Sequence, residues 1–97
     1  MTLHTGQSPV VAYRLVMVID RHLDEPIYQQ IARFLREQIE SGKIEARRPI
    51  PSIRSICQQY GVARATAGKA IKILADEGLI RAVKGRGWFV VPEADRR

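Results

Sequence analysis

The pattern of apolar and polar residues predicts two short helices between residues 51 and 78. In the first, apolar side chains recur at i, i+3, i+4 and i+7, so they share one face of a 3.6-residue period. These residues are Ile53, Ile56, Cys57 and Tyr60. Ser52 precedes them and is placed to cap the helix. A tight turn is predicted at Tyr60, Gly61 and Val62.

The second predicted helix repeats this spacing and has two faces of different character. Its apolar face consists of Ala67, Ala70, Ile71 and Leu74. Ala65, Lys69 and Lys72 project from the opposite side. Two helices joined by a glycine-containing turn, the second with a cationic outer face, are typical of a helix-turn-helix, whose second helix can enter the major groove of DNA.

A third helix is predicted upstream. Asp24 and Pro26 mark its start, because proline suits the first helical turn and an acidic residue suits the positive helix end. Its buried stripe is Ile27, Ile31, Leu35 and Ile39, with Phe34 beside them. Gly42 ends it.

The segment from Lys43 to Pro51 is predicted to be a loop of restricted flexibility, because it contains two prolines. Arg47 and Arg48 lie in this loop, directly before the cap of the next helix. Such a pair is either solvated or placed to contact phosphate.

After Gly78 the period changes, and a β-hairpin is predicted. Two β-prone runs, Leu79–Val83 and Trp88–Val91, flank a cationic tip. The tip is Lys84, Gly85, Arg86 and Gly87. Trp88 and Phe89 fall on opposite faces of their strand. A cationic hairpin after a helix-turn-helix makes a winged helix, whose wing can lie along the DNA backbone or in the minor groove.

The two ends of the chain are predicted to lie outside this unit. Residues 20–92 form the winged helix-turn-helix domain, 1–19 an N-terminal extension and 93–97 a polar tail that frays. Within the extension, Val10 to Ile19 is rich in β-prone residues and is predicted to be an additional strand. This strand either packs on its own domain or pairs with the same segment of a second copy.

Composition narrows the possible partners. The chain has 97 residues, which is enough for one domain with a modest core, and a net charge of +6. The whole excess lies in residues 43–73, where 7 Lys or Arg stand against 1 acidic residue. A charge gathered in this way suits a polyanionic partner.

Several other classes of protein are disfavoured. One cysteine cannot form an internal disulfide, which favours a reducing compartment. There is no zinc-ligand spacing, and no nucleophile, base or metal cluster converges, so we expect neither a metal or other cofactor nor an enzyme. The apolar run 10–19 is about half the length of a membrane span and is interrupted by Arg14, so we expect no membrane partner. A signal peptide is equally disfavoured.

With these residues in view, the chain resembles the DNA-binding domain of the GntR family of bacterial transcriptional regulators, over roughly residues 18–91. Six short motifs carry the resemblance through their order and spacing. They are Val-Ile-Asp at 18–20, Pro-Ile-Tyr at 26–28, Ile-Pro-Ser-Ile-Arg at 50–54, Gly-Val-Ala-Arg-Ala-Thr at 61–66, Ala-Asp-Glu-Gly-Leu-Ile at 75–80 and Gly-Arg-Gly-Trp-Phe-Val at 85–90.

The resemblance implies roles for individual residues. Arg54 matches the position that contacts the DNA backbone, Arg64 the one that reads guanine, and Thr66 a phosphate ligand. Gly85 and Gly87 match the wing glycines. The chain departs from the family at Ala63, where serine or threonine is usual, at Gly68, where arginine is common, and at Ile53, where an acidic residue is usual.

The sequence therefore predicts sequence-specific binding of double-stranded DNA, by a homodimeric repressor-type transcriptional regulator on a palindromic operator. The predicted DNA-binding residues are Arg47, Arg48, Ser52, Arg54, Arg64, Ala65, Thr66, Gly68, Lys69, Lys72, Lys84, Gly85, Arg86 and Gly87. Two alternatives remain open: a DNA-binding protein for plasmid partition or recombination in a mobile element, and a winged helix used for protein contact.

Length is the largest departure from the family. Its members usually carry a C-terminal effector-binding or dimerisation domain, whereas only a few residues follow the wing here. No site for a small-molecule effector is evident. The chain is expected to be either a free-standing small DNA-binding protein, which its start at Met1 slightly favours, or a domain cut from a longer one.

Overall fold

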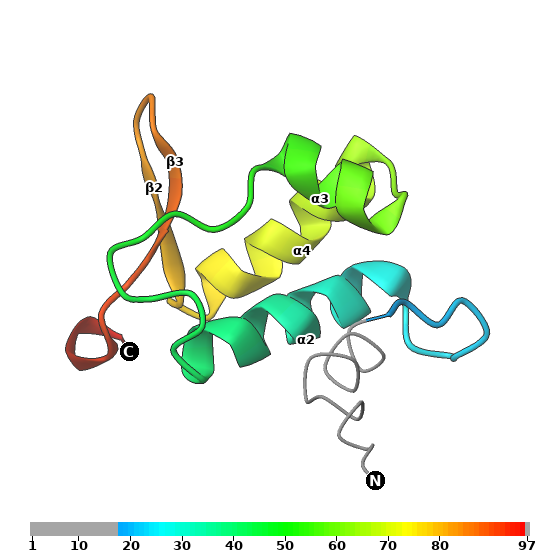
Figure 1. The fold of residues 1–97 in the computed structure, drawn as a ribbon, viewed down its shortest axis with the longest axis horizontal. Coiled ribbons are helices and arrows are strands. Elements are labelled where there is room, and N and C mark those ends of the chain that lie inside the picture. The colour runs from blue at the N-terminus through cyan, green and yellow to red at the C-terminus, as the bar shows by residue number, and fades with distance from the viewer. Residues whose placement is uncertain (1–17, 97) are drawn as a thin grey trace, which may run out of the picture.

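The computed structural model describes residues 18–96, in which three α-helices are followed by a two-stranded antiparallel hairpin and a short 3-10 helix (Figure 1). The elements are α2 (Ile27–Glu40), α3 (Ile53–Tyr60), α4 (Arg64–Asp76), β2 (Ile80–Val83), β3 (Gly87–Val90) and η1 (Glu93–Asp95). The predicted fold class, a mainly α winged helix-turn-helix with a small hairpin, is confirmed. The additional strand predicted at 10–19 lies outside the described residues except for Val18 and Ile19, which are in no strand.

The core lies where the three helices meet the base of the hairpin. Figure 1 shows α2 and α4 lying side by side, α3 above α4, and the hairpin rising beside them. The predicted stripe of α2 and the apolar face of α4 are buried, with Ile27 half-buried at one end of the stripe. The buried core cluster is Ile31, Ala32, Leu35, Ile39, Ile50, Ile56, Ala67, Ala70, Ile71, Leu74, Leu79, Ile80 and Val90.

The apolar face predicted for α3 is only partly buried. Ile56 has no exposed surface, whereas Ile53, Cys57 and Tyr60 are half-buried at the edge of the core. The reason is that α3 is short and packs chiefly against α4, so its flanks are open. Ile53 thereby remains accessible next to the predicted DNA-binding residues.

The start of α2 is organised by a buried polar side chain. Pro26 stands just before the first helical residue, and no side chain caps this end. Instead Gln30, which is 1% exposed, donates to the carbonyl oxygens of Asp20 and Glu25 and accepts from the Asp20 amide, all at 2.9 Å. Because a buried amide must be hydrogen-bonded, these three bonds fix the lead-in segment against the helix.

Two glycines shape the connections between helices. Gly42 has a φ of 84° directly after α2, and Gly61 has a φ of 65° after α3. Both conformations are left-handed and favour glycine. The Gly61 amide closes α3 by donating to the Cys57 carbonyl at 2.8 Å. The predicted helix end at Gly42 and the predicted turn at Gly61 are confirmed.

The hairpin pairs Ile80 with Val90 and Val83 with Gly87, one residue inside the predicted outer limits at Leu79 and Val91. Trp88 packs against the core cluster, whereas Phe89 lies beside Arg86, whose Cζ is 6.0 Å from the ring centroid. The prediction that these two aromatic residues occupy opposite faces fits this arrangement.

Residues 47–50, predicted to be a loop, pair with the hairpin as well. The amides of Arg47 and Ile50 donate to the carbonyls of Val90 and Trp88, and the Val90 amide donates to Arg48, each at 2.9 Å. The segment therefore lies along β3, to which it is joined by an isolated bridge between Pro49 and Phe89. No strand pattern marks this segment, because Arg47, Arg48 and Pro49 are not β-prone.

The tail, predicted to be polar and to fray, contains a short helical turn at residues 93–95. They form η1, after which the Arg96 side chain turns back and donates to the Val91 carbonyl at 2.9 Å. This bond holds the tail at the base of the hairpin, near the end of α2 (Figure 1).

Candidate nucleic-acid interface

Three arginines from three different elements line one hollow of the surface. Arg54 lies in the first turn of α3, Arg64 begins α4, and Arg86 lies at the tip of the hairpin. The hollow, of about 460 Å³, is called the arginine hollow below. Its lining residues are Pro49, Ile50, Pro51, Ser52, Ile53, Arg54, Arg64, Arg86, Gly87 and Trp88.

The start of α3 is fixed by the predicted cap. The Ser52 hydroxyl accepts a hydrogen bond from the Ser55 amide at 3.1 Å, which satisfies one of the unpaired donors of the first turn. Ser52 is also exposed in the arginine hollow, two residues before Arg54. The cap therefore determines where the Arg54 side chain leaves the helix.

The turn at Gly61 places the first residues of α4 at the surface. Arg64 and Ala65 are exposed, and Thr66 is half-buried. Ala63 occupies the cap position and forms no side-chain hydrogen bond, as expected from its methyl side chain. Within the described residues, no carboxylate pairs with Arg54 or Arg64.

The outer face of α4 is small near its start and cationic further on. Ala65 is exposed and Gly68 half-buried, one turn apart. Lys69 and Lys72 are exposed on the same side, as predicted, but each has an internal partner. The Lys69 ammonium stands 5.3 Å from the centroid of the Tyr28 ring, and Lys72 approaches Asp76 at 3.2 Å.

The wing presents two cations on a glycine-rich turn. Lys84 and Arg86 are exposed at the tip, and the Arg86 amide closes the turn by donating to the Val83 carbonyl at 2.8 Å. Gly85 and Gly87 have φ values of 76° and 105°, a backbone region in which a side chain would be strained. The two wing glycines thus have a conformational role in addition to the one implied by resemblance.

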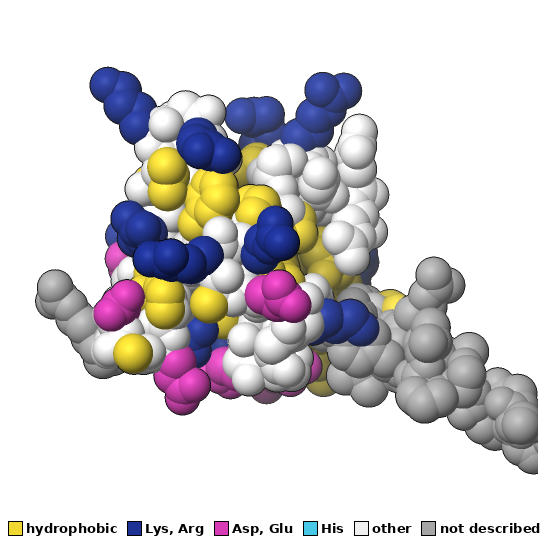
Figure 2. All heavy atoms as spheres, turned by 60° about the vertical axis from the view of Figure 1, so that its left-hand side comes forward, with side chains coloured by type: hydrophobic (Ala, Val, Ile, Leu, Met, Phe, Trp, Pro, Cys, Tyr) yellow, Lys and Arg dark blue, Asp and Glu magenta, His cyan; other side chains and the backbone are white. Residues whose placement is uncertain are grey.

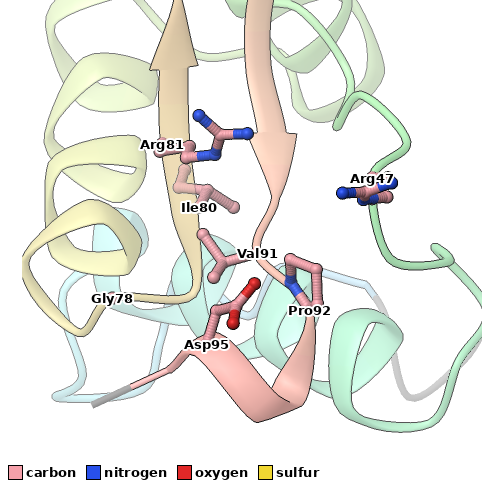
Figure 3. Close-up of a pocket in the computed structure, with 7 residues that line it drawn as sticks. All are labelled: Arg47, Gly78, Ile80, Arg81, Val91, Pro92 and Asp95. Carbon is pink, nitrogen blue, oxygen red and sulfur yellow. The ribbon is translucent and has the colours of Figure 1, made fainter.

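The structure does not bring Arg47 into the arginine hollow. Arg47 lines a different hollow, of about 350 Å³, together with Arg81 and Asp95 (Figure 3). Its φ of 69° is unusual for a residue with a side chain. Arg48 is exposed and lies 4.0 Å from Glu45, a weak surface pair. Arg47 and Arg48, both predicted to bind DNA, therefore lie outside the hollow lined by the other three arginines.

The arginines of α2 differ from those of the hollow because they are paired. Arg33 donates to Glu25 at 2.9 Å, and Arg36 forms two parallel bonds with Glu77 at 2.9 and 2.7 Å. These hydrogen bonds raise the pKa of both guanidinium groups above their ordinary value. In Figure 2, magenta carboxylates gather at the bottom of the view, while dark-blue cations project above them around yellow apolar atoms.

Other kinds of site have no support within residues 18–96. No three His, Cys, Asp or Glu side chains in this range are grouped so that they could hold a metal ion. No helix in the same range has the length and apolar character needed to cross a membrane.

Three helices followed by a cationic wing define a winged helix-turn-helix domain. The family model described as "Bacterial regulatory proteins, gntR family" matches residues 27–90. The chain therefore belongs to the GntR family of bacterial transcriptional regulators.

Among related proteins, the transcriptional repressor NagR of Bacillus subtilis is 40% identical over 74 residues, which is 76% of this chain and 30% of NagR. The repressor MngR of Escherichia coli is 30% identical over 69 residues, 71% of this chain and 29% of MngR. The chain thus spans about 30% of the length of these relatives.

Two solved structures are similar over most of the chain. YtrA from Sulfolobus acidocaldarius, a GntR-family transcription factor, has a TM-score of 0.73 and 37% identity, covering 80% of this chain and 82% of its own. The DNA-binding domain of AraR, solved in complex with its operator ORE1, has a TM-score of 0.68 and 36% identity, and the match covers 74% of this chain and 88% of the AraR chain.

Two structural contributors to the site were missed from the sequence. Tyr28 holds Lys69, and Gln30 fixes the lead-in segment. Tyr28 belongs to a recognised motif, so its position gave some signal. Gln30 gave none, because a polar residue flanking an apolar stripe is ordinarily solvated.

Proposed function

We propose that this chain binds double-stranded DNA in a sequence-specific manner and acts as a repressor-type transcriptional regulator in the bacterial cytoplasm. One observation carries the proposal: Arg54, Arg64 and Arg86, from two helices and the wing, line one hollow and have no carboxylate partner in the described part of the chain. A guanidinium group that is paired with an internal carboxylate cannot give all its N–H donors to DNA, whereas these three guanidinium groups have no such pairing.

The division of labour follows from where each arginine lies. Arg64, at the start of α4, reads a guanine edge in the major groove through two parallel hydrogen bonds. Arg54 and Arg86 flank it and contact phosphates, which sets the register of the helix but carries no sequence information. Thr66 and Lys84 add backbone contacts, and Lys69 and Lys72 reach phosphate only by leaving Tyr28 and Asp76.

The same domain reads only about half of a typical operator, so we propose a homodimer on a palindrome with half-sites about one helical turn apart. The proposed dimer contact is the apolar segment 10–19. Removing residues 1–19 and measuring mass by light scattering tests this contact. A monomer is expected, and an unchanged dimer would exclude the segment.

Selection of bound duplexes from a random pool tests the DNA-binding proposal. We expect enrichment of two inverted half-sites, each containing a guanine. The control is the triple variant Arg54→Ala, Arg64→Ala, Arg86→Ala, in which the core is untouched because all three side chains are exposed. If the unmodified chain enriches no sequence and retains no duplex even in dilute buffer, the proposed function is wrong.

A further inference from the structure

A second hollow lies along α4, next to the arginine hollow. It has a volume of about 370 Å³ and is called the Gly68 hollow below. It is lined by Ile53, Gly68, Ile71, Lys72, Ala75, Asp76 and Trp88. Apart from Lys72 and Asp76, these residues are glycine or apolar, and Ile53 and Trp88 also line the arginine hollow. The two hollows are therefore neighbours on one surface, with different chemistry.

Gly68 leaves this hollow open, although a larger residue would fit at this position. A Cβ atom built at Gly68 would meet nothing within 4 Å, and the residue is in ordinary helical conformation. Glycine destabilises the interior of a helix, and the packing around Gly68 does not require it. Ala65, one turn earlier, is exposed and has only a methyl group. The start of α4 can therefore approach a base edge closely.

The surroundings of the Gly68 hollow restrict what can occupy it. Arg54, Arg64 and Arg86 stand beside it, and Lys72 stands at its wall. The only acidic residue among the lining residues, Asp76, is 3.2 Å from Lys72 and is neutralised by it. The occupant must be apolar where it touches Ile53, Ile71 and Trp88 but belong to a polyanion. In duplex DNA, the only apolar group on a base edge in the major groove is the C5-methyl of thymine.

We propose that the Gly68 hollow receives the C5-methyl group of a thymine, so that α4 reads a thymine by apolar contact beside the guanine read by Arg64. This inference rests on the proposed function and adds a second base to it. It assigns sequence specificity to Gly68 and to the apolar side chains around it. Of these side chains, only that of Trp88 has a hydrogen-bonding group, its indole N–H.

A uracil scan of the selected half-site tests the inference. Each thymine in turn is replaced by uracil, which removes only the methyl group, and binding is measured by fluorescence anisotropy. One thymine in each half-site is expected to show a loss of about fourfold, the equivalent of about 0.8 kcal/mol for one buried methyl group. The other thymines are expected to show no change.

The variant Gly68→Leu locates the methyl group. Its side chain has room at the Cβ and favours the helix, so the fold is retained, and the added atoms fill the hollow. The affinity ratio of thymine to uracil at the sensitive position should then fall to about one. The control is Ala94→Leu, an increase in side-chain size at an exposed residue of η1 that lines neither of the two hollows, and this variant should keep the fourfold ratio.

The outcomes separate the two proposals. If the chain binds its selected site but no thymine is sensitive to loss of the methyl, or if Gly68→Leu keeps the sensitivity, the inference is wrong and the proposed function stands. If the chain binds no duplex, both are wrong. If an apolar peptide competes equally well against thymine-containing and uracil-containing duplexes, the hollow does not discriminate thymine from uracil, and the inference is likewise wrong.

Discussion

The arginines of α2 and those of the arginine hollow are chemically identical but have opposite surroundings. Arg33 and Arg36 are engaged with Glu25 and Glu77. Arg54, Arg64 and Arg86 have no such partner among residues 18–96, and the Arg86 Cζ lies 6.0 Å from the centroid of the Phe89 ring. Net charge alone therefore does not locate an interface. What matters is where cations remain without internal carboxylates, because only these can give all their donors to a phosphate or a base.

The largest effect in this comparison is expected for Arg64→Ala. Loss of a bidentate contact to guanine should weaken specific binding by about 1 to 3 kcal/mol, or roughly 5- to 150-fold. Binding to an unrelated duplex should fall much less. Both are measured by anisotropy titration at one fixed salt concentration, and the thermal midpoint should not change because Arg64 is exposed. Equal losses on both duplexes would remove base reading from this residue.

A smaller effect is expected for Arg86→Ala, at the wing. If Arg86 contacts one phosphate, the slope of the logarithm of the binding constant against the logarithm of salt concentration should become shallower by about 0.9. Selected and unrelated duplexes should be affected alike, because a phosphate carries no sequence information. A titration series across salt concentrations measures the slope. An unchanged slope would place the wing away from the DNA backbone.

The smallest effect is expected for Arg36→Ala, the matched arginine on the paired side. Here we expect a loss of unfolding free energy of about 0.5 kcal/mol, because a partly exposed ion pair contributes little. That corresponds to a fall of about 2 to 4 °C in the thermal midpoint of a domain of this size. Specific DNA affinity should stay nearly constant. A loss of DNA affinity as large as that of Arg64→Ala would show that the paired arginines of α2 do not differ in DNA binding from those of the arginine hollow.

Helix positions were predictable because their apolar spacing is dense and their ends carry local signals. The α2 stripe, the α4 apolar face, the Ser52 cap and the turn at Gly61 depend on contacts within a few residues. The pairing of residues 47–50 with β3 was not predictable in the same way. It joins segments about 40 residues apart in the sequence, and its backbone hydrogen bonds leave no mark on side-chain type.

The candidate site was predictable as a set of residue types but not as an arrangement. The sequence could not separate Arg47, which lies in the loop before α3, from Arg54 in the first turn of α3, yet the two line different hollows. The ion pair between Lys72 and Asp76 could have been predicted from the sequence, because residues four apart on a helix are neighbours. The contact of Lys69 with Tyr28 depends on how α2 packs on α4, which no local pattern encodes.

The pairing of residues 47–50 with β3 also sets a fixed span. Only Pro51 and Ser52 separate this pairing from α3, and the fixed φ angles of Pro49 and Pro51 leave little slack between the wing and the helix. If Arg54 and Arg86 contact phosphates as proposed, the protein sets the distance between those phosphates, and the duplex has to adapt its groove width to it. Base steps that the protein never touches would thus be selected by how cheaply they deform.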